Sequence, residues 1–507
     1  MKDIERHETG KNMVRNVILI TIDSLRADHL SCFGYHKKTT PNIDNLARSG
    51  VMFRNAISCG PDTLTSILPL LTSSYVLEHY IEYVKKMKRE RGKETLRTSV
   101  EEFEAAREVI REIFRRRFTI AALMRRYGYS TAAFHSNPLL SRYYNVGGFD
   151  HFYDSLSIVN FKKYSIKRKI TGILERNRRL YDFAWYVYKN IYDKLKALKI
   201  VRVGEIGKSV PYERADIINE RVISWLKKRK DKFFIWIHYM DVHFPYKPPK
   251  KFQFNKIKEL EMSDINYKML TKPDDLSTRE INELINLYDG EIRYVDYSIK
   301  SLLEELEEID ALEGTALILT ADHGDEFGEH GDFAHHHAKL YEELIHVPLI
   351  ISNTEYKNIV IDEPVSLLDI FPTILDLVGI HAKECKEEFQ GKSLIPLINR
   401  EGKGDERQEG ERGVISESMY KGKRNVSYRT REWKIILNSI EGQYELYNLR
   451  KDPEERVNLY EVEEEKTEKL KKKIIEHLLE QKQRIREIKE CEKERIKRIL
   501  RAKIENI

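Results

Sequence analysis

The sequence has little of several features that would define a special class of protein. It contains four cysteines in 507 residues, at scattered positions that match neither a disulfide framework nor a zinc-ligand spacing. It has no apolar run near the ~20 residues that a helix needs to cross a bilayer, and its longest apolar clusters are only as long as strands. Positive and negative side chains nearly balance, leaving a net charge of +6, which is too small to indicate a nucleic-acid partner.

The chain also lacks an apolar stretch at its start. Residues 1–12 are charged and do not have the form of a secretory signal, so we expect a cytoplasmic protein. The hydrophobic fraction of 41% is large enough for a substantial core and excludes a disordered or collagen-like chain.

Apolar segments that alternate with helical patterns predict an α/β fold. Residues 16–23 form an apolar run that ends in a carboxylate, which is typical of a strand buried on both faces of a parallel sheet. Similar runs follow at 130–134, 233–237, 316–320 and 347–351. Strands separated by helices favour a mostly parallel sheet. Ligands in such sheets bind beyond the carboxyl ends of the strands, where the sequence places Asp23, His238 and Asp322.

Composition divides the chain into one large unit and two smaller C-terminal parts. The large unit spans residues 14–400 and includes two helical insertions, at about 78–117 and 155–210. The second insertion mixes lysines with aromatic residues. It is interpreted either as a helical subdomain with its own core or as a basic, aromatic element that contacts a membrane surface or caps the substrate.

The remaining residues predict a small sheet followed by a helix. After a polar, Gly-rich linker that ends at Gly413, short strand-like runs predict a C-terminal subdomain over 414–460. Residues 461–507 are rich in Lys and Glu, with apolar residues at helical spacing. We expect a charged helical tail that packs on the surface or contacts a second copy in a homo-oligomer.

Three short segments carry residue types whose chemistry exceeds what packing requires. Asp23 directly follows a buried strand, and residues 62–66 are rich in hydroxyl groups just before a helix start. The pair formed by Asp322 and His323 ends another strand. Carboxylates combined with an imidazole suit Zn²⁺ or Mn²⁺ better than Ca²⁺, so the combination predicts a divalent-metal site.

The chain also carries a long series of motifs in one order. They include Ile22-Asp-Ser-Leu-Arg-Ala-Asp-His-Leu, Thr40-Pro-Asn-Ile-Asp, Phe53-Arg-Asn-Ala, Leu70-Leu-Thr-Ser, His243-Phe-Pro-Tyr, Ala321-Asp-His-Gly-Asp and Leu340-Tyr-Glu-Glu. From about Val14 to Tyr460, the chain therefore resembles the sulfatase family of the alkaline-phosphatase superfamily. The resemblance implies an alkaline-phosphatase-like three-layer sandwich and a metal-dependent enzyme that cleaves esters.

The resemblance implies a covalent nucleophile, and here the sequence departs from the family. Sulfatases usually carry Cys-x-Pro-x-Arg, whose cysteine is oxidised to formylglycine, whereas this chain has Cys59-Gly-Pro-Asp followed by Thr63. The family nucleophile stands ten residues after the Phe of Phe-x-Asn-Ala and nine before the Thr of Leu-Leu-Thr-Gly. Counted from Phe53 and from Thr72, both spacings lead to Thr63. A threonine nucleophile is expected, with a formylglycine at Cys59 and an inactive site as the alternatives.

The resemblance also implies which residues bind the metal. The cation is expected on Asp23, Thr63, Asp322 and His323. Ser24 replaces a second family aspartate, and His323 supplies an imidazole in place of hard oxygen ligands. This favours Zn²⁺ or Mn²⁺ over Ca²⁺ or Mg²⁺.

A further set of residues is implied to contact the substrate. His243 matches the family histidine that holds the substrate anion or protonates the leaving oxygen. The other candidate substrate-binding residues are His336, His337 and Asn137. His330 and His335 are expected at the surface because the loop around them is acidic and rich in glycine.

These expectations describe a sulfatase-like hydrolase of sulfate or phosphate esters. A threonine ester cannot collapse to an aldehyde as a formylglycine hydrate can, so its cleavage requires attack on sulfur or phosphorus, which is routine for phosphoryl groups. The first alternative is a phosphodiester or phosphoglycerol-type transferase or hydrolase that acts on lipid headgroups or glycans, with peripheral membrane contact. The second alternative is a binding protein that kept the fold and lost catalysis.

Overall fold

The computed structural model describes residues 14–81, 110–111, 113–114, 117–140, 148–154, 212–335, 339–382, 388–401, 412–420, 423–439 and 441–504. Most of the first predicted insertion, all of the second and most of the predicted linker lie outside these residues.

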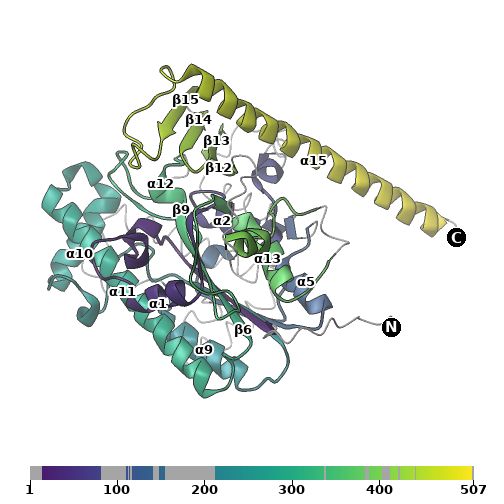
Figure 1. The fold of residues 1–507 in the computed structure, drawn as a ribbon, viewed down its shortest axis with the longest axis horizontal. Helices are drawn as coiled ribbons and strands as arrows, with labels where there is room; N and C mark the ends of the chain where they lie inside the picture. Colours follow the sequence, from purple (N-terminus) through teal and green to yellow (C-terminus); the bar gives the residue numbers. More distant parts are fainter. Residues whose placement is uncertain are drawn as a thin grey trace, which may run out of the picture.

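A nine-stranded sheet lies at the centre of the described molecule (Figure 1). Its strand order is β10-β2-β9-β6-β1-β5-β3-β4, and β11 also pairs with β2. The strands are β1 (Asn16–Ile22), β2 (Val51–Ile57), β3 (Ser130–His135), β4 (His151–Tyr153), β5 (Phe233–Tyr239), β6 (Thr315–Ala321), β9 (His346–Ser352), β10 (Ile359–Ile361) and β11 (Val365–Ser366).

The sheet is mostly parallel, which confirms the predicted α/β fold. β1 is parallel to both of its neighbours, β5 and β6, and all seven of its residues are buried. The exception is β9, which runs antiparallel to β2 and β6. An apolar run predicts burial but not direction, so the sequence did not distinguish β9 from the parallel strands.

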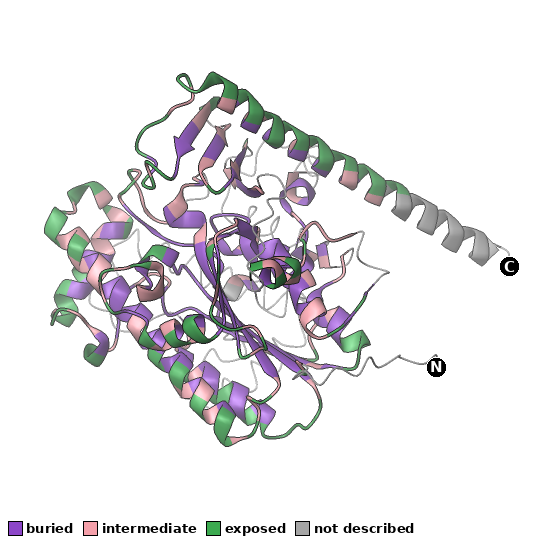
Figure 2. Ribbon diagram, in the orientation of Figure 1, coloured by how far each residue is buried: buried purple, intermediate pink, exposed green. Residues whose placement is uncertain are grey.

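Helices cover both faces of the sheet and complete a three-layer sandwich (Figure 1). One group contains α1 (Pro41–Ser49), α9 (Ala215–Leu226), α10 (Glu259–Thr271) and α11 (Thr278–Glu308). The other contains α2 (Thr63–Thr72), α5 (Ile120–Arg126), α13 (Ile370–Leu377) and α14 (Ile395–Glu401). Figure 2 shows the buried strands between these helices. Within the described residues, no helix is both long enough and apolar enough to span a membrane.

A second, antiparallel sheet follows near the C-terminus. It consists of β12 (Val414–Tyr420), β13 (Lys423–Arg429), β14 (Trp433–Asn438) and β15 (Gln443–Asn448), paired in sequence order. The long helix α15 (Glu464–Ile504) lies along this sheet and then extends away from it (Figure 1). Leu470 and Ile474 of α15 belong to one buried cluster with Val426 and Ile435 of the sheet.

Two small elements lie between β6 and β9. A hairpin is formed by β7 (Glu326–Phe327) and β8 (Phe333–Ala334), which pair antiparallel. The short helix α12 (Glu342–Ile345) then leads directly into β9. This connection carries most of the histidines considered below.

Candidate active site

Two of the predicted metal ligands follow neighbouring strands that are in register. β1 pairs with β6 so that Ile22 stands opposite Ala321, and the next residues are Asp23 and Asp322. Ser24 has a φ of 60°, in the left-handed region that costs a non-glycine residue roughly 1–2 kcal/mol. Its backbone N–H donates to Asp322 Oδ1 at 3.2 Å and its hydroxyl donates to Asp23 Oδ1 at 3.0 Å. The turn at Ser24 therefore holds the two carboxylates side by side.

His323 completes a group of three side chains that fits a cation. Its Nδ1 donates to Gly324 O at 2.8 Å, which leaves the lone pair of Nε2 facing the carboxylates. Nε2 lies 3.6 Å from Asp322 Oδ2 and 3.8 Å from Asp23 Oδ1, and all three side chains are fully buried. Among the described residues, neither Nε2 nor Asp322 Oδ2 has a hydrogen-bond partner. Buried lone pairs that converge in this way fit a divalent cation.

The second oxygen of Asp23 is contacted by side chains from three other segments. Asp23 Oδ2 accepts a hydrogen bond from Asn137 Nδ2 at 3.1 Å and from the Thr63 hydroxyl at 3.5 Å. His238 Nε2 lies 3.2 Å from the same oxygen, and its Nδ1 lies 2.8 Å from the Thr21 hydroxyl. Sequence analysis placed His238 at this edge of the sheet but did not count it among the site residues. Its position at the end of a strand beside β1 was the signal that could have found it.

Burial and neighbouring charges shift the pKa values of these groups in opposite directions. Burial raises the pKa of Asp23, but three nearby histidines, led by His243, outweigh it and hold that pKa below its usual range. Burial, reinforced by the charge of Asp23, raises the pKa of Asp322 to about 8. Burial lowers the pKa of His323. The two carboxylates therefore repel each other in a dry site, and a bound cation would relieve that repulsion.

Thr63 and Cys59 occupy different environments. Thr63 is the first residue of α2, and the preceding Asp62 caps the helix by accepting the N–H groups of Leu64 and Thr65 at 3.0 and 3.1 Å. Cys59 is 1% exposed and its Sγ lies 3.5 Å from the Ser366 hydroxyl in β11. Burial raises the pKa of the Cys59 thiol to about 12. The hydroxyl of Thr63 reaches Asp23, whereas the thiol of Cys59 packs toward β11.

His243 lies in the loop that follows β5. Its backbone N–H donates to Met240 O at 3.0 Å, and its Nδ1 donates to Phe244 O at 2.6 Å. These contacts leave Nε2 to face the site. Burial lowers the pKa of His243, while the charge of Asp23 opposes this effect.

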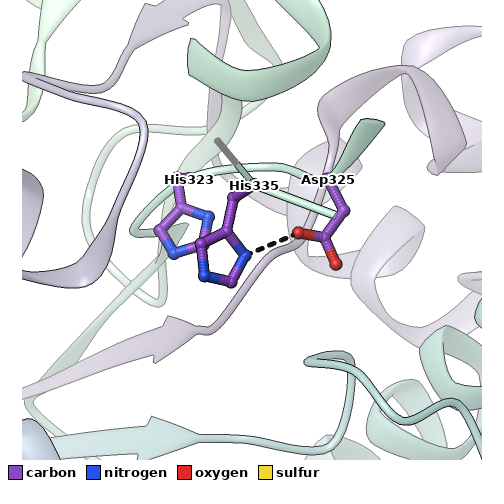
Figure 3. A group of neighbouring side chains, drawn as sticks. All are labelled: His323, Asp325 and His335. Carbon is purple, nitrogen blue, oxygen red and sulfur yellow. Dashed lines mark hydrogen bonds and ion pairs between the residues drawn. The ribbon is translucent and has the colours of Figure 1, made fainter. Parts of the chain in front are cut away.

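His335, which was expected at the surface, is partly buried, with 21% of its side chain exposed, and it lies beside the site. Figure 3 shows its ring beside that of His323, with 4.5 Å between the ring centroids, and its centroid is 5.2 Å from that of His243. Its Nδ1 lies 2.9 Å from Asp325 Oδ1. Burial lowers the pKa of His335, but the pairing with Asp325 raises it overall to about 9. The carboxylate of Asp325 is itself buried, and it draws His335 inward from an otherwise polar loop.

His330, also expected at the surface, is partly buried as well. Its side chain is 14% exposed, with Nδ1 2.6 Å from Glu343 Oε1, and its ring stacks on Tyr341 at 3.6 Å. Three of the side chains in this region could surround a cation, namely Glu326, His330 and Glu343. However, Lys339 Nζ already lies 3.0 Å from Glu326 Oε1, so a protein ammonium group supplies the positive charge there.

The predicted substrate-binding residues are only partly described. Asn137 lies beside Asp23, as given above. His336 and His337 lie outside the described residues, and their contact with a substrate stays a prediction.

The fold belongs to the α/β class, and a group of side chains at the carboxyl edge of the sheet could hold a cation. The chain matches the family model described as Sulfatase over residues 15–380. It also matches the model described as N-sulphoglucosamine sulphohydrolase, C-terminal, over residues 328–484. The chain belongs to the sulfatase family, whose members are metal-dependent hydrolases.

Several known proteins are similar along nearly the whole chain. An arylsulfatase from Clostridium perfringens is 25% identical over 92% of this chain and 95% of its own length. A solved protein in complex with its substrate D-glucosamine-2-N,6-O-disulfate superposes with a TM-score of 0.61, at 18% identity, over 92% of this chain and 98% of that one. The phosphonate monoester hydrolase of Agrobacterium radiobacter also has a TM-score of 0.61, at 19% identity, over 93% and 96% of the two chains.

Proposed function

We propose that this protein hydrolyses sulfate or phosphate esters with Thr63 as its nucleophile and a divalent cation as its cofactor. The observation that carries the proposal is the position of the Thr63 hydroxyl, which lies 3.5 Å from Asp23 Oδ2. Cys59, which a formylglycine mechanism would require, is directed toward Ser366 instead. The spacing of the flanking sequence motifs supports the same assignment.

The proposed cation is Zn²⁺ or Mn²⁺, held by Asp23, Asp322 and His323. This choice follows from the mixed set of two carboxylates and one imidazole. The cation would supply positive charge beside the threonine hydroxyl and favour its ionised form. His238 and Asn137 both contact Asp23 Oδ2. They would therefore orient this carboxylate so that Oδ1 faces the cation.

The residues of the chain divide the reaction between them. Thr63 Oγ1 forms a bond to the sulfur or phosphorus of the ester, and the bond from that atom to the leaving oxygen breaks. The protonated form of His243 is assigned to give its Nε2 proton to the leaving oxygen, because its Nδ1 is committed to Phe244 O and only Nε2 can face the substrate. Water then attacks the same sulfur or phosphorus, and the bond from that atom to Thr63 Oγ1 breaks. Nε2 of His243 takes a proton from this water, and Oγ1 regains from the solvent the proton that it released in the first step.

The test compares several esters on one preparation of the full chain. The assays use p-nitrophenyl sulfate, p-nitrophenyl phosphate and bis-p-nitrophenyl phosphate, each with added Mn²⁺ or Zn²⁺. We expect Thr63→Ala to lower kcat for the preferred ester by about 10³-fold or more, because a nucleophile cannot be replaced by binding alone. Thr65→Ala, on the same turn of α2, is the matched control and should retain activity.

Two other results would replace the proposal. Full turnover by Thr63→Ala together with loss of turnover by Cys59→Ala would assign the nucleophile to a formylglycine. Mass spectrometry of the peptide that contains Cys59 would then show an aldehyde instead of a thiol. If all three esters remain uncleaved and neither variant differs from the wild type, the chain is a binding protein with a sulfatase fold.

A further inference from the structure

The C-terminal sheet contacts the loop of residues 58–62, which leads into the proposed nucleophile, Thr63. The backbone N–H of Glu417 in β12 donates to Cys59 O at 2.8 Å, and the Ser416 hydroxyl donates to Ser58 O at 2.5 Å. A Cβ on Gly60 would lie only 2.7 Å from Glu417 O. β12 therefore lies directly against the segment that leads into Thr63.

The same loop is tied on its other side to the proposed metal ligands. The Ser58 hydroxyl donates to Asp322 O at 2.5 Å, and the Ser58 N–H donates to Ile345 O at 2.8 Å. The loop is thus held between β12 and the turn after β6. A displacement of β12 would change the distance between the Thr63 hydroxyl and Asp23.

The side chain of Glu417 connects this contact to the long C-terminal helix. Glu417 is 2% exposed, and its Oε1 lies 2.6 Å from Nε2 of His477 on α15. Arg424 of β13 pairs with the same carboxylate and, through its NH1, with Glu78 at 2.8 Å. All four side chains are at least nine-tenths buried, so the geometry of this group is tightly constrained.

An aromatic contact also connects α15 to Tyr75, which lies just after the end of α2. The ring of His477 packs edge-on against Tyr75, with 4.7 Å between the centroids. Tyr75 follows α2 closely in the chain, and its hydroxyl donates to Ile415 O in β12 at 3.0 Å. Figure 1 shows α15 lying along the C-terminal sheet, where these contacts occur.

We propose that Glu417 and His477 are positioning residues for the nucleophile. Glu417 is the link, because its backbone N–H donates to Cys59 O in the loop of residues 58–62 and its side chain contacts His477 of α15. Through this link, α15 determines where the Thr63 hydroxyl lies relative to Asp23. The inference rests on the proposed function, in which Thr63 is the nucleophile.

The experiment compares three α15 variants of the full chain. His477→Leu removes the contact to Glu417, His477→Gln keeps a side-chain amide donor of similar reach, and Lys473→Ala is the control on the exposed face of the same helix. We expect His477→Leu to lower kcat about tenfold or more with little change in KM, because small misplacements of a reacting group are costly. His477→Gln should recover most of this loss, and Lys473→Ala should match the wild type.

Amide hydrogen exchange in the peptide of residues 58–66 provides a readout that does not depend on turnover. We expect faster exchange in His477→Leu than in Lys473→Ala. If His477→Leu fails to fold, Glu417→Gln gives the same comparison with a side chain of the same shape. Unchanged exchange in this peptide, or unchanged kcat in folded His477→Leu, would overturn the inference. If the wild type cleaves no ester, the proposed function fails, and the exchange data alone decide whether α15 holds the loop.

Discussion

At the residue scale, two buried carboxylates, those of Asp241 and Glu291, share one arginine beside His243. Asp241 Oδ1 lies 3.3 Å from Arg214 NH1, and Arg214 also pairs with Glu291 at 2.6 Å. Among the described residues, Asp241 Oδ2 has no hydrogen-bond partner. One guanidinium thus serves two buried carboxylates. Burial raises the pKa of Asp241 to about 8 and that of Glu291 to about 7.

Replacing Asp241 by asparagine is expected to change how stability depends on pH. The carboxyl of Asp241 has an ordinary pKa of 3.8 in the unfolded chain. Between about pH 4 and pH 8, the folded protein therefore holds a proton that the unfolded chain has lost. Because of this group, the free energy of unfolding of the wild type falls by about 1.4 kcal/mol for each pH unit by which the pH rises across that range. Asp241→Asn removes this dependence.

The measurement is urea denaturation of both proteins at pH 5, 7 and 9. The stability of Asp241→Asn relative to the wild type should increase from pH 5 to pH 7 and increase less from pH 7 to pH 9. Parallel stability curves for the two proteins would show that Asp241 does not hold the proton.

At the element scale, the turn after β6 depends on the absence of a side chain at Gly324. A Cβ there would lie 2.1 Å from Glu343 O and 2.9 Å from Arg26 Cγ. The Gly324 N–H donates to Leu344 O at 2.9 Å, and Gly324 O accepts the hydrogen bond that orients His323. The close approach of α12 to this turn therefore determines where His323 Nε2 points.

Gly324→Ala is expected to weaken metal binding. The backbone of Glu343 cannot move aside as a flexible side chain would, so the turn must shift and His323 must move with it. Loss of a partner that orients a metal ligand costs about 10–100-fold in metal affinity, and chelator competition with Zn²⁺ or Mn²⁺ measures this loss.

Gly379→Ala is the control for Gly324→Ala. Gly379 has a φ of +69°, and a Cβ added there would meet no described atom within 4 Å, so alanine strains the backbone without touching the site. It should lower stability and keep the metal affinity. Equal metal affinity in both variants would contradict the role given to Gly324.

At the scale of the whole molecule, a buried ion cluster joins the central fold to the C-terminal sheet. Lys434 of β14 has a fully buried side chain, with Nζ 3.1 Å from Glu342 Oε1 and 2.9 Å from Glu455 Oε1. The N–H of Glu342, in α12, donates to Glu455 Oε2 at 2.7 Å. The cluster therefore links α12, β14 and the segment after β15.

Lys434→Met should destabilise the whole protein, because it leaves the buried carboxylate of Glu455 without its cation and leaves Glu342 with only Arg429, whose NH2 lies 3.3 Å from Glu342 Oε2. Removing one partner of a buried ion pair costs about 3–5 kcal/mol, which denaturant unfolding can measure. Lys434→Met combined with Glu455→Gln should recover part of the loss. The exposed ion pair of Lys473 gives the comparison, because Lys473→Ala should change stability by less than about 0.5 kcal/mol. Similar stabilities for Lys434→Met and Lys473→Ala would show that the cluster contributes little.

The central strands could be predicted because their apolar residues form continuous runs. Continuous apolar runs mark β1, β3, β5 and β6 as buried on both faces. The two- and three-residue strands β4, β10 and β11 have too few residues to show a period. β15 was not predicted as a separate strand, because its alternation of apolar and polar residues is weak.

The sequence by itself determined the family, the α/β fold and the meeting of Asp23 with Asp322 at the sheet edge. These conclusions depend on local patterns and on the rule that parallel strands end at one edge. Only the tertiary structure decided that His335 reaches His323 and that Cys59 packs toward Ser366. It also decided that the backbone N–H of Glu417 donates to Cys59 O, in the loop that leads into Thr63. Such contacts join residues far apart in the chain, and their geometry depends on how whole elements pack rather than on any local sequence signal.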